Sequence, residues 1–385
     1  MGTDLATRVR EDVGSYDDIA AAAVRTTGMD DFGGTDHEEG LRLLVEDLNA
    51  PTAGLTGAGN YLQRAQVKSC LVGRLLTQAG IIQHPSYADV TIERPVFVVG
   101  LPRTGTTALH RLLTADERHQ GLELWLTEYP QPRPPRETWA DDPVFNGINA
   151  AYAQHHVANP EFMGIHYMDA TSVEECWRLL RQTGKSISFE SLAHVPAYSQ
   201  WLAGQDWTDA YERHRTALQL IGLHDQDKRW VLKNPSHLVA LDALMAVYPD
   251  ALIVQTHREP VTSIASACSL SAEATAGWST TFVGETIGRT QLEMLARSHR
   301  SFNEARPRYD AAQFFDVEYA DFVADPVATT KAIYTAFDLG WTPEVAATVE
   351  AIDAESKSGG RRPQHAYSLA DYGLTEDEVR AAFGS

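Results

Sequence analysis

Residues 94–113, RPVFVVGLPRTGTTALHRLL, divide into an apolar run, a turn bounded by two glycines and an amphipathic segment. The β-branched and aromatic run from Val96 to Val99 predicts a buried strand. Gly100 to Gly105 predicts a tight loop, and Thr106 begins a segment with apolar residues at helical spacing. In such a strand–loop–helix unit, the loop amides and the helix N-terminus can surround an anion. The unit therefore predicts a phosphate or sulfate site.

The loop nearly matches the P-loop pattern G-x-x-x-x-G-K-[ST], but Thr106 stands where that pattern has lysine. Kinases and ATPases use this lysine on the β- and γ-phosphates, together with Mg²⁺. Its absence argues against nucleoside triphosphate chemistry. Arg103, inside the loop, can supply the missing positive charge.

The composition is that of a globular protein, because 43% of the 385 residues are hydrophobic and 22% are charged. A formal net charge of −20 argues against a general nucleic-acid-binding surface. An anionic ligand therefore needs a local group of basic residues.

The three cysteines, Cys70, Cys176 and Cys268, are widely separated and show no C-x-x-C spacing. They predict reduced, buried thiols and no zinc site. The acidic N-terminal residues include no apolar leader, and no apolar run reaches the ~18 residues of a spanning helix. We therefore expect a soluble, cytoplasmic protein without a transmembrane segment.

Residues 1–90 predict a helical N-terminal extension, interpreted as packing structure in preference to a dimerisation or acceptor-binding element. Residues 91–340 predict the α/β domain, with a helical insert at about 140–225 that lines the acceptor site. Within the insert, residues 172–183 predict a helix with Glu174 and Glu175 in its first turn. The proline-dense residues 130–135 are expected to form a stiff wall of that site. Residues 341–385 predict a C-terminal tail.

Two further strand-then-helix units follow the insert. Residues 229–232 predict a strand that leads to Lys233 and to a helix from Asn234, and residues 251–255 predict a strand that precedes Arg258 and a second helix. Residues 281–306 predict a long amphipathic helix, and residues 314–326 a late strand and helix. This order is typical of a P-loop-like parallel sheet flanked by helices, an α/β fold. Such sheets bind ligands at the carboxyl ends of their strands.

The residues Gly100 to Thr107, GLPRTGTT, resemble the 5′-phosphosulfate loop of sulfotransferases that use 3′-phosphoadenosine-5′-phosphosulfate (PAPS). Arg258-Glu259-Pro260, with Ser266 in the following helix, resembles the 3′-phosphate motif of that family. An arginine fork and a hydroxyl suit a phosphate monoester. The resemblance covers residues 94–326. It implies these donor-binding residues: Pro102, Arg103, Thr104, Gly105, Thr106, Thr107, Arg258 and Ser266.

The basic, glycine-containing residues 357–369 resemble more weakly a C-terminal loop that closes over the 3′-phosphate in this family. The resemblance implies that Arg361 or Arg362 contacts this phosphate, and a solvated loop is an equal alternative.

The resemblance also implies the reaction, an in-line transfer of a sulfuryl group from PAPS to a hydroxyl of a metabolite, lipid or glycan, without a metal. Arg103 and Lys233 would stabilise the developing charge. A base must accept the hydroxyl proton, and His237 is the first candidate, while Glu123 and Glu128 compete with it and His166 is weaker.

Two other functions stay open at this point. A P-loop-type small-molecule kinase would need ATP and Mg²⁺ and is disfavoured by Thr106. A non-catalytic nucleotide-binding protein would bind without turnover. The sequence names neither the acceptor nor the oligomeric state, with a homodimer kept as one expectation.

Overall fold

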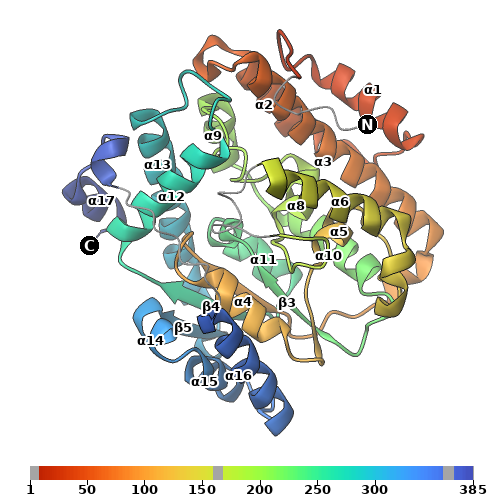
Figure 1. Cartoon of the computed structure of the whole chain (residues 1–385), viewed down its shortest axis with the longest axis vertical. Helices are drawn as coiled ribbons and strands as arrows, with labels where there is room; N and C mark the ends of the chain where they lie inside the picture. Colours follow the sequence, from red (N-terminus) through yellow and green to blue (C-terminus); the bar gives the residue numbers. More distant parts are fainter. Residues whose placement is uncertain (1–7, 159–167, 359–367, 385) are drawn as a thin grey trace.

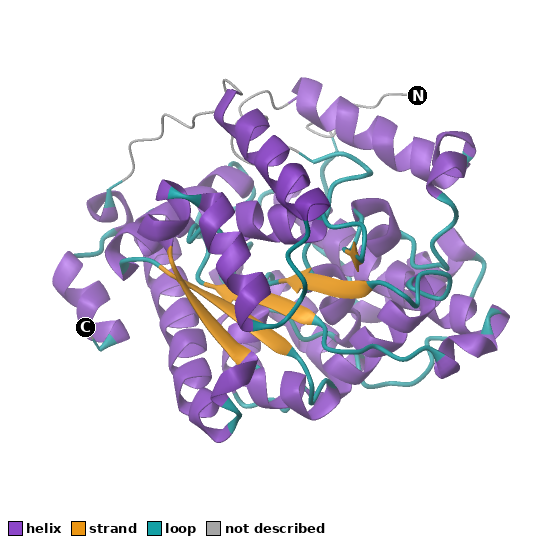
Figure 2. Cartoon of the chain, turned by 90° about the horizontal axis from the view of Figure 1, so that it is seen from below, coloured by secondary structure: helices purple, strands orange, loops and turns teal. Residues whose placement is uncertain are grey.

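The computed structural model describes residues 8–158, 168–358 and 368–384. A five-stranded sheet lies at its centre in the order β2-β3-β1-β4-β5, and every pairing in it is parallel. The strands are β1 (Val96–Gly100), β2 (His119–Gln120), β3 (Arg229–Lys233), β4 (Leu252–His257) and β5 (Phe314–Glu318). Helices cover both faces of the sheet (Figure 2). The predicted P-loop-like α/β fold is therefore confirmed.

Alternate residues of the central strand enter two separate cores, as the period of two in a strand requires. Val96 and Val98 join a cluster with residues of α4 (Thr106–Thr114) and α15 (Pro326–Ala336). Phe97 and Val99 face the larger cluster on the other side. Because both faces are buried, the strand is an uninterrupted apolar run, as is typical of parallel sheets.

The N-terminal helices are α1 (Tyr16–Thr27), α2 (Glu38–Asn49) and α3 (Gly57–Gln83). They lie together beside the helices that follow β2 (Figure 1). Helix α2 packs on α9 (Pro196–Ala203), and α3 packs on α10 (Thr208–Ile221). The large apolar cluster runs through these helices and the sheet without a break.

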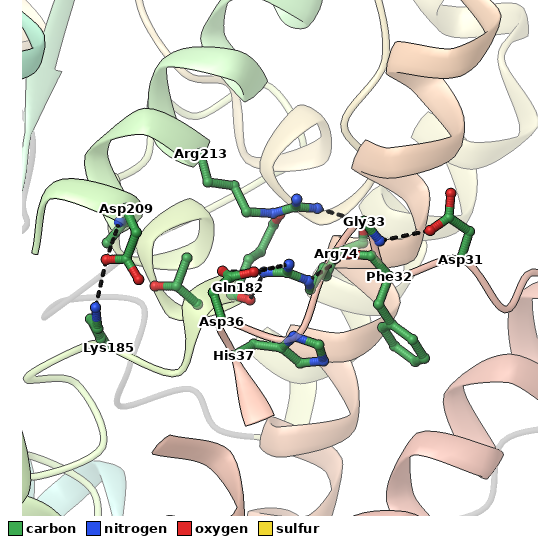
Figure 3. Close-up of polar contacts among 12 residues, drawn as sticks. Asp31, Phe32, Gly33, Asp36, His37, Arg74, Gln182, Lys185, Asp209 and Arg213 are labelled. Atoms are coloured by element: carbon green, nitrogen blue, oxygen red, sulfur yellow. Dashed lines mark hydrogen bonds and ion pairs between the residues drawn. The ribbon is translucent and has the colours of Figure 1, made fainter. Parts of the chain in front are cut away.

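Buried polar contacts also join the N-terminal helices to the rest of the chain (Figure 3). Arg74 of α3 donates two hydrogen bonds to the Asp36 carboxylate, at 2.9 and 2.5 Å. Its guanidinium also donates to the backbone carbonyl oxygens of Phe32, at 2.7 Å, and Gln182, at 3.1 Å. Arg213 of α10 donates to the Arg74 carbonyl oxygen at 2.9 Å. Burial beside Arg74 lowers the pKa of Arg213 to about 9.

The segment between β2 and β3 also contains α5 (Leu124–Glu128), α6 (Pro143–Ala158) and α8 (Trp177–Leu180). The continuous helix predicted for residues 172–183 is wrong. Val173 forms an antiparallel bridge with Glu123, and Glu174 and Glu175 have no regular secondary structure before the short helix α8. The amides of Glu174 and Cys176 bond to the distant carbonyl oxygens of Leu122 and Lys233.

The remaining helices follow β3, β4 and β5. They include the short 3₁₀ helix η6 (Pro235–Leu238) and the α-helices α11 (Leu241–Val247), α12 (Pro260–Ala274), α13 (Glu285–Ala305), α14 (Tyr319–Ala324), α16 (Pro343–Ser358) and α17 (Glu376–Phe383). The single helix predicted after Asn234 is divided into η6 and α11, and α13 begins at Glu285, four residues later than predicted.

Helix α16 packs against α4, and α17 packs against α12 and α13. None of the helices in the described part of the chain has the length and apolar character needed to cross a membrane.

Candidate active site

The loop of residues 100–105, here the anion loop, joins β1 to α4. Gly105 has φ 87°, and a Cβ atom at this position would lie 3.1 Å from the Phe322 ring. Only glycine suits this close left-handed turn. Thr104 donates to the Leu101 carbonyl oxygen at 2.7 Å and shares a hydrogen bond of 2.6 Å with Thr256 of β4. The neighbouring strand therefore holds the loop in place.

The N-terminus of α4 suits a bound anion. Gly105 is its N-cap residue and provides no side chain to cap the first amides of the helix. Such uncapped amides can donate to phosphate or sulfate oxygens. Arg103 adopts φ 71°, which is unusual for a residue other than glycine. Left-handed residues of this kind often mark functional loops.

Two arginines and a serine meet at this loop from separate parts of the chain. Arg103 Nε donates to Ser266 Oγ of α12 at 3.1 Å. Arg258, which follows β4, donates to the Arg103 carbonyl oxygen at 2.7 Å, and its guanidinium lies 4.2 Å from the centroid of the Tyr319 ring. The two sequence motifs therefore occupy one edge of the sheet.

A third cation, Lys233, lies at the end of β3. Its Nζ donates to Thr107 Oγ1 in the first turn of α4 at 2.9 Å and to Glu175 Oε1 at 2.5 Å. The Lys233 side chain is 3% exposed, and the ion pair with Glu175 compensates for its burial. Positive charge therefore collects around the anion loop in a protein of net charge −20.

The structure brings most of the predicted donor-binding residues together, but it places His237 elsewhere. His237 is fully buried, its Nδ1 lies 2.6 Å from the Tyr211 hydroxyl, and its ring meets Phe97 edge-on at 5.0 Å between centroids. Burial lowers its pKa well below the usual 6.5. The 3₁₀ turn η6 directs this side chain into the core. This position argues against its predicted role as base.

The two predicted glutamates are each paired with an arginine. Glu123 lies 3.0 Å from Arg133, which also binds Asp225 at 2.8 Å. Glu128 forms an ion pair with Arg178, which donates to the Tyr152 hydroxyl at 2.9 Å. Neither glutamate lines the cavity described next. The other predicted residues, His166, Arg361 and Arg362, lie outside the described residues.

A cavity of about 590 Å³ opens beside the anion loop. Pro102 of the loop and residues 234–236 after β3 form the wall nearest to the anion loop. The other walls are mainly apolar, with Trp177, Ile187, Leu192, Leu270, Trp278 and Met294 among their residues. A cavity of this size and character suits a small organic molecule.

The sequence predicted some of the cavity-lining residues wrongly. The proline-dense residues 130–135 do not line this cavity, because the Arg133 amide is bonded to the Ile221 carbonyl oxygen and holds that loop against α10. Glu174 and Glu175, which the sequence placed in a helix, do line it. Two adjacent acids before an apolar segment are typical of a helix N-terminus, and for this reason the sequence predicted a helix at these residues.

Among the residues that the structure describes, no three His, Cys, Asp or Glu side chains come together in a way that could hold a metal ion.

Comparison with known proteins gives consistent results. A model described as the Sulfotransferase family matches residues 95–343. The crystal structure of sulfotransferase STF1 from Mycobacterium tuberculosis H37Rv is 51% identical, with a TM-score of 0.90 over 97% of this chain and 99% of that chain. The structure of sulfotransferase STF9 from Mycobacterium avium is 28% identical, with a TM-score of 0.87 over 97% of this chain and 96% of that one.

A curated relative gives a similar result at lower identity. The omega-hydroxy-beta-dihydromenaquinone-9 sulfotransferase Stf3 of Mycobacterium bovis is 25% identical over 292 residues, which are 73% of this chain and 71% of Stf3.

Proposed function

Because the chain belongs to the sulfotransferase family and moves a sulfuryl group to a small-molecule acceptor, we propose that its sulfuryl donor is PAPS. The single observation that carries the proposal is the meeting of Arg103, Arg258 and Ser266 at one edge of the sheet. A donor with phosphates at both its 5′ and 3′ positions needs two anion sites side by side. The kinase and the non-catalytic alternatives are not favoured by these relatives.

In this proposal the anion loop and the N-terminus of α4 hold the 5′-phosphosulfate. Backbone amides, the Thr106 and Thr107 hydroxyls and Arg103 donate to its oxygens. Lys233, which contacts Thr107, adds a positive charge where the 5′-phosphate oxygen departs. Arg258 and Ser266 hold the 3′-phosphate, and the Arg258 side chain is already placed by its contacts with the loop and Tyr319.

We further propose that the acceptor presents a hydroxyl group on an apolar body. The mainly apolar walls of the cavity support this, since they would desolvate a hydrocarbon favourably and leave many polar groups of a sugar unpaired. The name of Stf3, a sulfotransferase of an omega-hydroxylated dihydromenaquinone, points in the same direction. A cytoplasmic location, a homodimer and a contact of Arg361 or Arg362 with the donor stay predictions from the sequence.

The test is calorimetric titration with 3′-phosphoadenosine-5′-phosphate (PAP), the product of the donor, beside AMP and ATP–Mg²⁺. We expect tight binding of PAP alone. Arg258→Ala should weaken PAP binding roughly 100-fold, because a charge-assisted phosphate contact is lost, and should leave the weak binding of AMP unchanged. A preference for ATP–Mg²⁺, or equal binding of AMP and PAP, would overturn the proposed donor.

A further inference from the structure

We propose that Glu175 is the base that accepts the proton of the acceptor hydroxyl. This inference rests on the proposed function and names the residue that would act at the same site. Glu175 lies where the cavity and the anion loop meet. It lines the cavity, and its Oε1 accepts a hydrogen bond from Lys233, which also donates to Thr107 of α4. An acceptor hydroxyl in the cavity could therefore touch the Glu175 carboxylate close to the sulfuryl group.

The backbone holds Glu175 from both sides. The preceding residue, Glu174, donates its amide to the Leu122 carbonyl oxygen at 2.6 Å, and the following residue, Cys176, donates to the Lys233 carbonyl oxygen at 3.0 Å. The first contact ties the segment to the chain after β2, and the second ties it to the end of β3. A base needs this kind of fixed position, because proton transfer requires hydrogen-bond geometry.

The competing groups are less suited to this role. Glu174 also lines the cavity, but it is 5% exposed and its Oε1 accepts a hydrogen bond from the Glu175 amide at 2.7 Å. The Glu175 side chain is 22% exposed, so substrate can reach it. Glu123 and Glu128 are paired with arginines outside the cavity lining, and His237 is in the core.

The step balances as follows. The acceptor O–H bond breaks, its proton passes to the Glu175 carboxylate, and the acceptor oxygen forms a bond to sulfur. The bond between sulfur and the 5′-phosphate oxygen breaks, and its electron pair leaves with that oxygen on PAP. Lys233 stabilises the negative charge on this oxygen. Glu175 then releases the proton to solvent, so the products are a sulfate ester, PAP and one proton.

The experiment compares Glu175→Gln with its neighbour Glu174→Gln in the full chain. Turnover of PAPS is measured with 4-nitrophenol, with the less acidic 4-ethylphenol, and with water as the acceptor. PAP affinity is measured by calorimetry on each variant. We expect Glu175→Gln to lower kcat with 4-ethylphenol and water by about 10²- to 10⁴-fold, the usual contribution of a general base. Glu174→Gln should lose less activity than Glu175→Gln with 4-ethylphenol, and its loss should be the same for both phenols.

The acidity of the acceptor separates a base from a residue that only positions Lys233. 4-Nitrophenol ionises without help from a base, so the turnover of 4-nitrophenol should fall much less than that of 4-ethylphenol in Glu175→Gln. With 4-ethylphenol, the pH–rate profile of Glu175→Gln should lack the acidic limb that the wild type shows. In Glu175→Gln, an equal loss for both phenols or an unchanged rate would overturn the inference. A larger loss of 4-ethylphenol turnover in Glu174→Gln than in Glu175→Gln would also overturn it. If the wild type fails to bind PAP, the proposed donor itself is wrong, and the two failures are thereby distinguished.

Discussion

Arg103 Nε donates a hydrogen bond to the Ser266 hydroxyl at 3.1 Å, although 163 residues separate the two in the sequence. The contact exists because β1 and β4 are adjacent parallel strands, paired from Val96 with Leu252 to Gly100 with Thr256. The loop after β1 and the helix after β4 therefore begin at one edge of the sheet. The two sites proposed for the donor phosphates are coupled through this pair.

The coupling can be measured by a double-mutant cycle on PAP affinity. Arg103→Ala should weaken binding about 10- to 100-fold and Ser266→Ala about 10-fold, because each removes a hydrogen bond to a charged group. The double variant should lose less than the combined effect, since the residues share a contact and a ligand. Arg111→Ala, at an exposed position of α4, is the matched control and should leave affinity unchanged. Additive losses would contradict the coupling.

A large side chain added to the cavity wall should weaken binding of the acceptor without weakening binding of the donor. Ala274→Trp, on the cavity wall in α12, should raise KM for a long-chain primary alcohol at least tenfold, because the added ring occupies the space of the apolar body. PAP affinity should stay within about twofold, since Ala274 is not in the anion loop. Ala153→Trp, exposed on α6, is the control for adding the same ring elsewhere. Equal effects of both variants on KM would contradict the assignment of the cavity to the acceptor.

The Arg74–Asp36 pair should contribute strongly to stability. Asp36→Asn leaves the guanidinium of Arg74, which is 1% exposed, without its counter-charge. We expect the free energy of unfolding to fall by about 3 kcal/mol, the lower end of the range for a broken buried pair, because the Asp36 side chain is one-third exposed.

Urea denaturation would measure the effect of Asp36→Asn. Glu378→Gln, which breaks the exposed pair with Arg289, should cost much less stability and serves as the control. Similar costs for the two variants would show that the burial of Arg74 does not matter.

Stability should fall steeply in mild acid. Burial lowers the pKa of His37, His110 and His214 to about 3 each. Between pH 6.5 and pH 3 these histidines bind protons in the unfolded chain but not in the folded one, so falling pH favours unfolding. Between pH 6.5 and pH 5 each contributes about 1 kcal/mol per pH unit on average, and together they contribute about 3.

Urea unfolding between pH 6.5 and pH 5 would measure this slope. His214→Gln should reduce it by about 1 kcal/mol per pH unit, whereas the exposed His224→Gln should leave it unchanged. A slope that does not respond to His214→Gln would contradict the prediction.

The features that the sequence predicted correctly depend on nearby residues. The run Val96 to Val99 is apolar at every position, so it forms a strand buried on both faces, and Gly105 provides the turn into α4. Successive strand-then-helix units imply parallel strands, since a crossover helix returns the chain to the same edge. The confirmed fold follows from these local signals. The two-residue strand β2 was missed because it is too short for any periodicity.

Tertiary contacts decided the features that the sequence predicted wrongly or missed. Residues 172–176 have the composition of a helix start, but the amides of Glu174 and Cys176 bond to distant carbonyl oxygens and hold the segment outside a helix. His237 has the right neighbours for a catalytic base, yet the turn η6 places it in the core.

The sequence by itself therefore determined the fold, the anion loop and the family, because glycine spacing and apolar period act over a few residues. Only the tertiary structure decided which carboxylate meets Lys233. The pairing of Glu175 with Lys233 spans 58 residues and depends on two backbone hydrogen bonds, one to Leu122 after β2 and one to Lys233 at the end of β3. No local propensity encodes such a contact, since its geometry exists only after the sheet has assembled.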